Sequence, residues 1–283
     1  MLQHSQIPAV ITGTTLALAD KLDTLAGIFA IGEKPTGTKD PFGLRRAAIG
    51  VIRIAIENRL DLDLSRLLTR AVALAREDME KSAAAAGKPA PQLATENVAA
   101  EVYNYVLERL RAYYLERAEG VTGANASGAP AAAITTEMFD AVLATRPASP
   151  LDFDARLKAL STFLTMSEAA SLTAANKRVA NILRKAGENA PTSVEISVLQ
   201  APAERQLFDA MRERREGVSA ATARRDYAAS LALLAQLRPT VDAFFDEVMV
   251  MDEDPKLRAN RLALLAQMRE LFAGVADLSR LPG

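Results

Sequence analysis

Residues 166–187 read MSEAASLTAANKRVANILRKAG, and this stretch predicts an amphipathic helix. Its apolar positions recur every three or four residues, which places them on one face of a helix. Gly187 follows the last periodic position, as at many helix C-termini. Thr165 and Glu168 have the spacing of a capping box, so the helix is expected to begin there. The positions expected to point inward are Leu172, Ala175, Val179, Ile182, Leu183 and Ala186.

The same period recurs over most of the chain. Apolar residues make up 49% of the sequence and aromatic residues only 5%, and much of the apolar content is Ala and Leu, both strong helix formers. Only residues 194–199 (VEISVL) alternate like a strand, and one short alternation makes no sheet, so they are predicted to be an extended connector. The predicted fold class is all-α. Helices are expected around 18–29, after Asp40, and at about 63–81, 94–119, 136–145, 150–164, 166–186, 202–216, 220–237, 239–251 and 255–274.

Helix-breaking residues separate these segments. Asp40 directly precedes Pro41, the arrangement of an N-cap followed by proline at the first helical position. Residues 82–92 (SAAAAGKPAPQ) are predicted to be a linker. Residues 120–133 (GVTGANASGAPAAA) are predicted to be a poorly packed loop, because they are rich in small residues and lack periodicity.

Signals for catalysis are thin. The chain has no cysteine and one histidine, His4, which excludes a disulfide, a thiolate metal site, a Ser–His or Cys–His pair and a multi-histidine metal centre within it. Asp20 and Asp23 lie three apart on one helix, where they form either a metal or acid–base pair or an ordinary solvated face. The solvated face is favoured, so no catalytic residue and no metal site is predicted.

Charge and hydropathy argue against a membrane protein, a secreted protein and a uniformly basic nucleic-acid-binding domain. No stretch approaches the roughly 20 apolar residues that a membrane span needs, and the N-terminus lacks the pattern of a signal peptide, so a cytoplasmic protein is expected. The net charge is −1, which argues against a domain that is basic throughout, as many nucleic-acid-binding domains are. Binding of a nucleic acid must therefore rest on local clusters.

Three clusters of basic residues are candidates for such binding. The first lies on the 166–186 helix, opposite its apolar face, where it presents cations as a phosphate backbone requires; on pattern alone a solvated face explains it equally well. The second surrounds the break before Pro41, and the third is diluted by neighbouring glutamates. The clusters are Lys177, Arg178, Asn181, Arg184 and Lys185; Lys34, Lys39, Arg45 and Arg46; and Arg212, Arg214, Arg215, Arg224 and Arg225.

Four blocks together resemble one family. They are LALADKLDTLAGIFAIGEKPTGTKDPFGLRRAAIGVIRI (16–54), ANKRVANIL (175–183), FFDEVMVMDEDPKLRANRLALL (244–265) and LFAGVADLSRL (271–281). In this order they resemble the C-terminal part of the β subunit of bacterial heterotetrameric glycyl-tRNA synthetase. The run PTGTKDPFGLRR is the most specific of these matches, and residues 82–150 match least well.

The resemblance implies a function without chemistry of its own. That family assembles as α2β2, and its α subunit uses ATP and Mg to make glycyl-adenylate, whereas the β subunit mainly binds tRNA. The expected partners are therefore tRNA(Gly) and the α subunit, with no membrane and no DNA. The chain is expected to carry no cofactor and to be non-catalytic alone, as part of a glycine–tRNA ligase.

The resemblance also implies a domain plan. Residues 1–92 resemble the remainder of an HD-like helical domain plus a linker, 93–165 a connecting helical body, and 166–283 the anticodon-binding helical domain of arginyl-type synthetases. Asp20 corresponds to a metal-binding Asp of hydrolytic HD domains, but their histidines have no counterpart here, so it is assigned no metal. The implied tRNA-binding residues are Lys177, Arg178, Asn181, Arg184, Lys185, Arg258, Lys34, Lys39, Arg45 and Arg46.

Two alternatives remain at this point. One is the remnant of an HD-type metal-dependent phosphohydrolase, and the other is a helical protein-interaction scaffold. Arg258 is also ambiguous as an RNA ligand, because its neighbour Arg261 lies beside apolar positions. Arg261 is expected to pair with acids such as Asp246 and so to hold the C-terminal bundle together.

Overall fold

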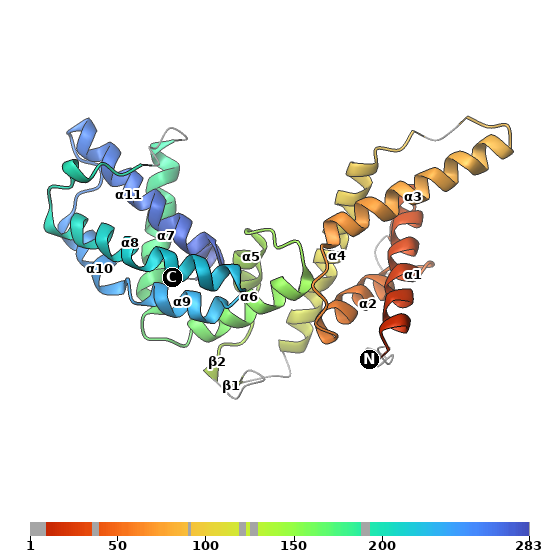
Figure 1. Ribbon diagram of the computed structural model, residues 1–283, viewed down its shortest axis with the longest axis horizontal. Coiled ribbons are helices and arrows are strands. Elements are labelled where there is room, and N and C mark those ends of the chain that lie inside the picture. The colour runs from red at the N-terminus through yellow and green to blue at the C-terminus, as the bar shows by residue number, and fades with distance from the viewer. Residues whose placement is uncertain are drawn as a thin grey trace. The chain divides into compact units, whose positions relative to one another are not determined.

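The structure is a computed structural model that describes residues 10–35, 40–89, 92–118, 123–124, 130–187 and 193–282. Helices form nearly all of its regular structure, so the all-α prediction is confirmed (Figure 1). The α-helices are α1 (Ile11–Ala30), α2 (Leu44–Glu57), α3 (Leu64–Ala85), α4 (Thr95–Ala118), α5 (Thr136–Leu143), α6 (Pro150–Phe163), α7 (Ala169–Ala186), α8 (Pro202–Ala223), α9 (Tyr227–Ala235), α10 (Arg238–Glu247) and α11 (Pro255–Ala273). Two 3₁₀ turns, η1 (Ile196–Val198) and η2 (Leu278–Arg280), complete the helical elements.

The chain forms two compact units. Unit 1 comprises Met1–Arg117 and Ala148–Asp154, and unit 2 comprises Ala118–Pro147 and Ala155–Gly283. The three-part division predicted from the sequence (1–92, 93–165 and 166–283) concerns domains in the functional sense, and it stays a prediction.

In unit 1, α1 packs against both α2 and α3. Leu25, Ile52 and Leu68, one from each of these helices, are completely buried in the contact. Packing of apolar helix faces against one another supplies most of the stability of helices in a protein. On α4 the hydroxyl of Tyr114 donates a 2.6 Å hydrogen bond to Asp154, and both side chains are buried.

The start of α2 differs from its prediction. The helix begins at Leu44, and Pro41 lies in the preceding turn rather than at the first helical position. Asp40 still caps the helix, because its carboxylate accepts the backbone N–H groups of Leu44 and Arg45 at 2.8 and 3.0 Å. Gly43, with φ of 67°, permits the tight approach that makes this possible.

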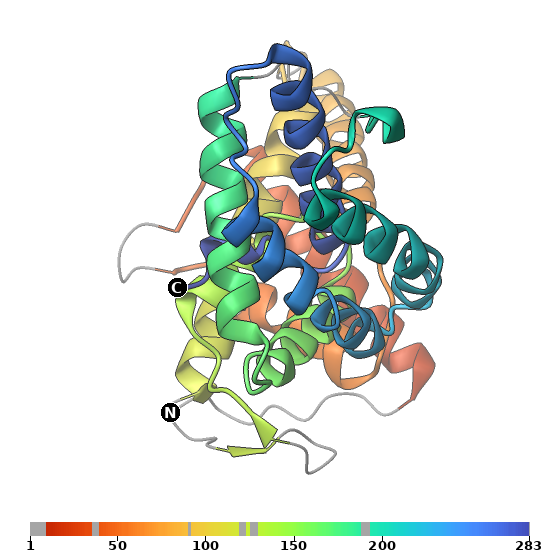
Figure 2. The ribbon, with the colours of Figure 1, turned by 90° about the vertical axis from the view of Figure 1, so that its left-hand side faces the viewer.

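In unit 2, α7 packs against α10, α11 and η2, while α8 packs against α9, α10 and α11. Figure 2 shows α7 and α11 running side by side. Proline occupies the first turn of α8, α10 and α11, as the sequence predicts, and proline is pre-organised for that position. Gly187 ends α7 with φ of 84°, also as predicted.

Several boundary predictions in unit 2 are wrong. The helix expected at 239–251 ends earlier, since α10 stops at Glu247. The segments 202–216 and 220–237 were expected to be separate helices, but α8 continues through Gly217 and ends at Ala223. The break falls at Arg225, whose φ of 58° turns the chain before Asp226 caps α9. The capping box of Thr165 and Glu168 does not form, because the Thr165 hydroxyl donates instead to the carbonyl of Thr162.

The connectors follow the predictions in part. Within the predicted extended connector 194–199, residues 196–198 form the 3₁₀ turn η1. The predicted linker begins later than expected, since α3 runs to Ala85. Of the predicted loop 120–133, the described residues are Gly123–Ala124 (β1), which pair antiparallel with Pro130–Ala131 (β2), and the residues that follow β2. The rest of that loop lies outside the described residues.

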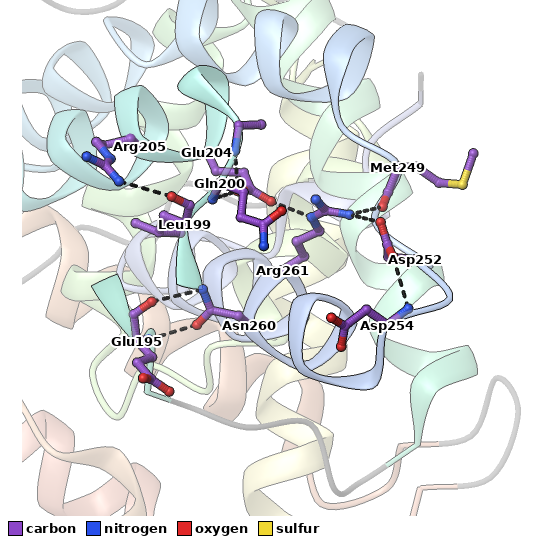
Figure 3. Close-up of polar contacts among 11 residues, drawn as sticks. Glu195, Leu199, Gln200, Glu204, Arg205, Met249, Asp252, Asp254, Asn260 and Arg261 are labelled. Carbon is purple, nitrogen blue, oxygen red and sulfur yellow. Dashed lines mark hydrogen bonds and ion pairs between the residues drawn. The ribbon is translucent and has the colours of Figure 1, made fainter. Parts of the chain in front are cut away.

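A buried ion-pair network joins three segments of unit 2 (Figure 3). The Arg261 side chain is 9% exposed and donates to the Glu204 carboxylate, to Asp252 Oδ2 at 2.6 Å and to the carbonyl of Met249 at 2.8 Å. Glu204 also accepts the backbone N–H groups of Gln200 and Ala201 at the start of α8. Arg261 therefore does hold the bundle together, but its partners are Glu204 and Asp252 rather than the expected Asp246.

A second contact in the same region fixes the connector before α8. Asn260 accepts the backbone N–H of Glu195 at 2.7 Å and donates to its carbonyl at 3.1 Å (Figure 3). The side chain is buried, and both of its polar atoms are satisfied by one residue. Asn260 ties α11 to the connector at Glu195. Arg261 ties α11 to the start of α8 and to the segment from Met249 to Asp252.

Candidate nucleic-acid interface

The exposed face of α7 carries the first predicted cluster. The opposite face buries Leu172, Val179 and Leu183 against its neighbours. The basic and polar residues predicted to face solvent do so: Lys177, Arg178, Asn181, Arg184 and Lys185 are all exposed. Within the described part of the chain, none of the four cations forms an ion pair with a carboxylate. The face therefore presents positive charge that its own neighbours leave available.

Two contacts organise this face. The guanidinium carbon of Arg178 lies 4.4 Å from the ring centroid of Phe245 on α10, a cation–π distance. One turn further along, Arg184 Nη2 donates to Asn181 Oδ1 at 2.9 Å. Neither pair buries its charged group, so both hold a side chain in place at the surface.

The same face is hollowed. A surface depression of about 420 Å³ is lined by Ala174, Lys177, Arg178, Asn181, Ile182 and Lys185. Its volume lies within the ~300–1,000 Å³ typical of ligand sites. Ile182 was expected to point inward, but it is only half-buried and lines the depression. A helical period places Ile182 at the edge of the apolar stripe, and it cannot tell which side of that edge a neighbour covers.

The second cluster lies in unit 1, where the structure ties two of its residues to α4. Lys34 Nζ is 2.7 Å from Glu101 Oε2. Arg45, half-buried at the start of α2, lies near Tyr105, one turn beyond Glu101. Burial raises the pKa of the Tyr105 hydroxyl, although Arg109 and Arg45 oppose that shift.

The remaining candidates divide into exposed, half-buried and undescribed residues. Arg46 is exposed, and Lys39 lies outside the described residues. Arg258 is half-buried and donates to the carbonyl of Asp252 at 2.9 Å, so it supports the segment before α11. RNA binding by Lys34, Lys39, Arg45, Arg46 and Arg258 stays a prediction.

Three arginines of the third cluster have partners on their own or a neighbouring helix, and for two of them the partner is a carboxylate. Arg212 lies 2.9 Å from Asp209, Arg214 lies 3.2 Å from Glu213, and Arg215 donates to Gln267 at 3.1 Å. Exposed pairs of this kind contribute little to stability, but each carboxylate reduces the positive potential around its partner. The contrast with α7 makes these arginines useful controls.

Other sites are not apparent in the described residues. Among them, no group of three or more His, Asp or Glu side chains is placed to hold a metal ion. Asp20 and Asp23 both face solvent, and the Asp20 carboxylate lies 4.0 Å from Lys21 Nζ. No described helix is long and apolar enough to cross a membrane.

Comparison with known proteins places the two units in a family. Residues 1–127 match the model of the glycyl-tRNA synthetase beta subunit, and residues 172–278, which include α7, match the DALR anticodon binding domain. The chain belongs to the glycyl-tRNA synthetase β-subunit family. The family that the four sequence blocks suggest is thus confirmed.

Individual relatives support this assignment. The chain is 46% identical over 277 residues to the glycine–tRNA ligase beta subunit of Pseudomonas aeruginosa, 44% over 276 residues to that of Photorhabdus laumondii, and 42% over 277 residues to that of Coxiella burnetii. Each alignment covers 98% of this chain and 36% of the relative. The chain therefore spans about a third of the length of these glycine–tRNA ligase beta subunits.

Proposed function

We propose that this chain is the tRNA-binding part of a glycyl-tRNA synthetase β subunit. The observation that supports this most is the exposed cationic face of α7 within the segment that matches an anticodon binding domain. Cations that are free of carboxylate partners neutralise phosphates and release their condensed counterions, which drives association with RNA. The chain would grip tRNA(Gly) through these contacts.

The work of such a chain is positioning. The α subunit of an α2β2 enzyme would supply the active site, with ATP and Mg, in the cytoplasm, and this chain would present the tRNA to it without a cofactor of its own. Holding reactants in the right geometry accounts for about 7–11 kcal/mol of a barrier without any catalytic side chain. This division of labour fits a chain whose described residues offer no metal cluster.

A titration tests the proposal against its rivals. We expect the 283-residue chain to retard the migration of tRNA(Gly) in an electromobility assay. The affinity should fall steeply with added salt. A protein-interaction scaffold would leave the mobility of tRNA unchanged at all salt concentrations. The phosphohydrolase alternative is not favoured, because Asp20 and Asp23 lie on a solvated helix face and belong to no group of three or more possible metal ligands among the described residues.

The second test concerns catalysis. Because the chain is proposed to lack an active site, we expect the purified chain to give no glycine-dependent exchange of pyrophosphate into ATP. Adding the α subunit together with a complete β subunit serves as the positive control. Exchange by this chain alone at a rate above a no-protein blank would contradict the proposed division of labour.

A further inference from the structure

We propose that the depression on α7 receives one unpaired nucleobase, which stacks on Arg178 and is read by Asn181. This inference rests on the proposed function, since it assumes that α7 meets RNA. It gives different roles to residues that the sequence pattern places on the same exposed face of the helix. The lysines hold the backbone, whereas Arg178 and Asn181 select what enters between them.

The argument begins with the shape of the depression. Ala174 and Ile182 supply apolar surface to its lining, and Lys177 and Lys185 supply cations. Eight residues separate these lysines and Asn181 lies midway, so each lysine is about 6 Å along the helix axis from the asparagine. Two lysines spaced in this way, with Arg178, Asn181 and Ile182 between them, suit a nucleotide whose flanking phosphates contact the lysines and whose base lies between them.

Arg178 provides a flat surface for the base. Phe245 supports its guanidinium on one side at 4.4 Å, and Arg178 itself is exposed and lines the depression. Unpaired bases stack on arginine guanidinium planes as they do on aromatic rings. The ring of Phe245 therefore pre-orders a platform that would otherwise lose side-chain entropy on binding.

Asn181 provides a directional hydrogen bond. A guanidinium only donates, so the amide atom that faces Arg184 at 2.9 Å is Oδ1. The amide N–H₂ of Asn181 consequently points away from Arg184, and Asn181 lines the depression. The ligand it fits is a base that presents a hydrogen-bond acceptor, and the stem of a duplex, whose bases are paired and stacked, does not fit.

The test compares two conservative substitutions in the full 283-residue chain. Arg178→Lys keeps the charge but removes the planar surface. Arg212→Lys is the matched control, because Arg212 also lies over a phenylalanine, Phe208, at 5.8 Å on α8. The probes are the anticodon stem–loop RNA of tRNA(Gly) and a series in which each loop nucleotide in turn is abasic, with affinity measured at several salt concentrations.

We expect Arg178→Lys to weaken binding of the intact stem–loop about tenfold, in line with the loss of one stacked base, with an unchanged salt slope. For one abasic RNA only, Arg178→Lys and the unchanged chain should bind with equal affinity. Asn181→Asp should also weaken binding of the intact stem–loop, and its loss should vanish for that same abasic RNA. Arg212→Lys should change nothing. Equal losses from Arg178→Lys on every RNA would overturn the base site while leaving RNA binding intact. Failure of the unmodified chain to bind any of the RNAs would overturn the proposed function as well.

Discussion

At the residue scale, the buried arginine network shows what a sequence can and cannot reveal. The apolar surroundings of Arg261 indicated a structural role, and that role is confirmed. Its partners were not predictable, because Glu204 is 57 residues away and only the folded chain brings it near. The predicted partner, Asp246, is exposed. Local spacing predicts neighbours on one helix but carries no information about long-range pairs.

Removal of Arg261 should be costly. Arg261→Ala leaves the Glu204 carboxylate, 1% exposed, without its cation, and breaking a buried pair from one side costs about 3–5 kcal/mol. Urea unfolding of unit 2, followed by circular dichroism, should show this loss. Arg258→Ala is the control, since it removes one partly buried hydrogen bond to a carbonyl and should cost about 1 kcal/mol. Equal effects of the two substitutions would argue against the network.

Asp252 should make the stability of unit 2 depend on pH. The backbone N–H of Asp254 and the Arg261 guanidinium hold the pKa of the Asp252 carboxyl below its ordinary value of 3.8. A carboxyl with a lowered folded-state pKa contributes stability that is complete above 3.8 and is lost as pH falls through the lowered value. The melting temperatures of Asp252→Asn and the unchanged chain should therefore differ at pH 7 and converge in acid. A difference that persists unchanged below pH 2 would contradict this origin.

At the element scale, helix existence was predictable and helix boundaries were less so. The expectation of separate helices at 202–216 and 220–237 was wrong because burial of Leu207, Met211 and Val218 continues on one face across Gly217. Tertiary packing overrides a local preference worth about 1 kcal/mol. The exposed basic face of α7 was predictable from the helical period of its apolar residues. The depression was not, because its shape depends on which neighbouring side chains cover Ile182.

Glycines in unit 1 give a test at this scale. Gly27 lies inside α1, and a Cβ there would meet nothing within 4 Å, so Gly27→Ala should stabilise unit 1 by about 0.5–1 kcal/mol. Gly43→Ala is the opposite case, because Gly43 has φ of 67° and its Cβ would lie 3.0 Å from Arg46 Nη2. It should destabilise by roughly 1–2 kcal/mol. Thermal unfolding curves in which both changes shift the melting temperature in the same direction would contradict the local geometry.

At the scale of the whole molecule, composition and four sequence blocks were enough to indicate the fold class and the family. The function proposed for the chain rests on a smaller feature, the exposed cations of α7 that form no ion pair within the described residues. A net charge of −1 conceals this feature, because the acidic residues elsewhere in the chain balance the basic ones, as Asp209 and Glu213 do for Arg212 and Arg214 on α8. The proposed RNA binding therefore depends on where the cations lie and not on their number.

The central claim, that α7 grips tRNA, is tested most directly by reversing charge at matched positions. The variant Lys177→Glu/Arg184→Glu/Lys185→Glu and the control Arg212→Glu/Arg215→Glu/Arg224→Glu change three exposed cations each, and both should keep the helical content and melting temperature nearly unchanged. The measurement is the affinity for tRNA(Gly) as a function of salt. We predict that the α7 variant binds more than tenfold more weakly with a flatter salt dependence, while the control binds nearly as the unchanged chain does. Equal affinities and salt slopes for the α7 variant and the unchanged chain would contradict the account.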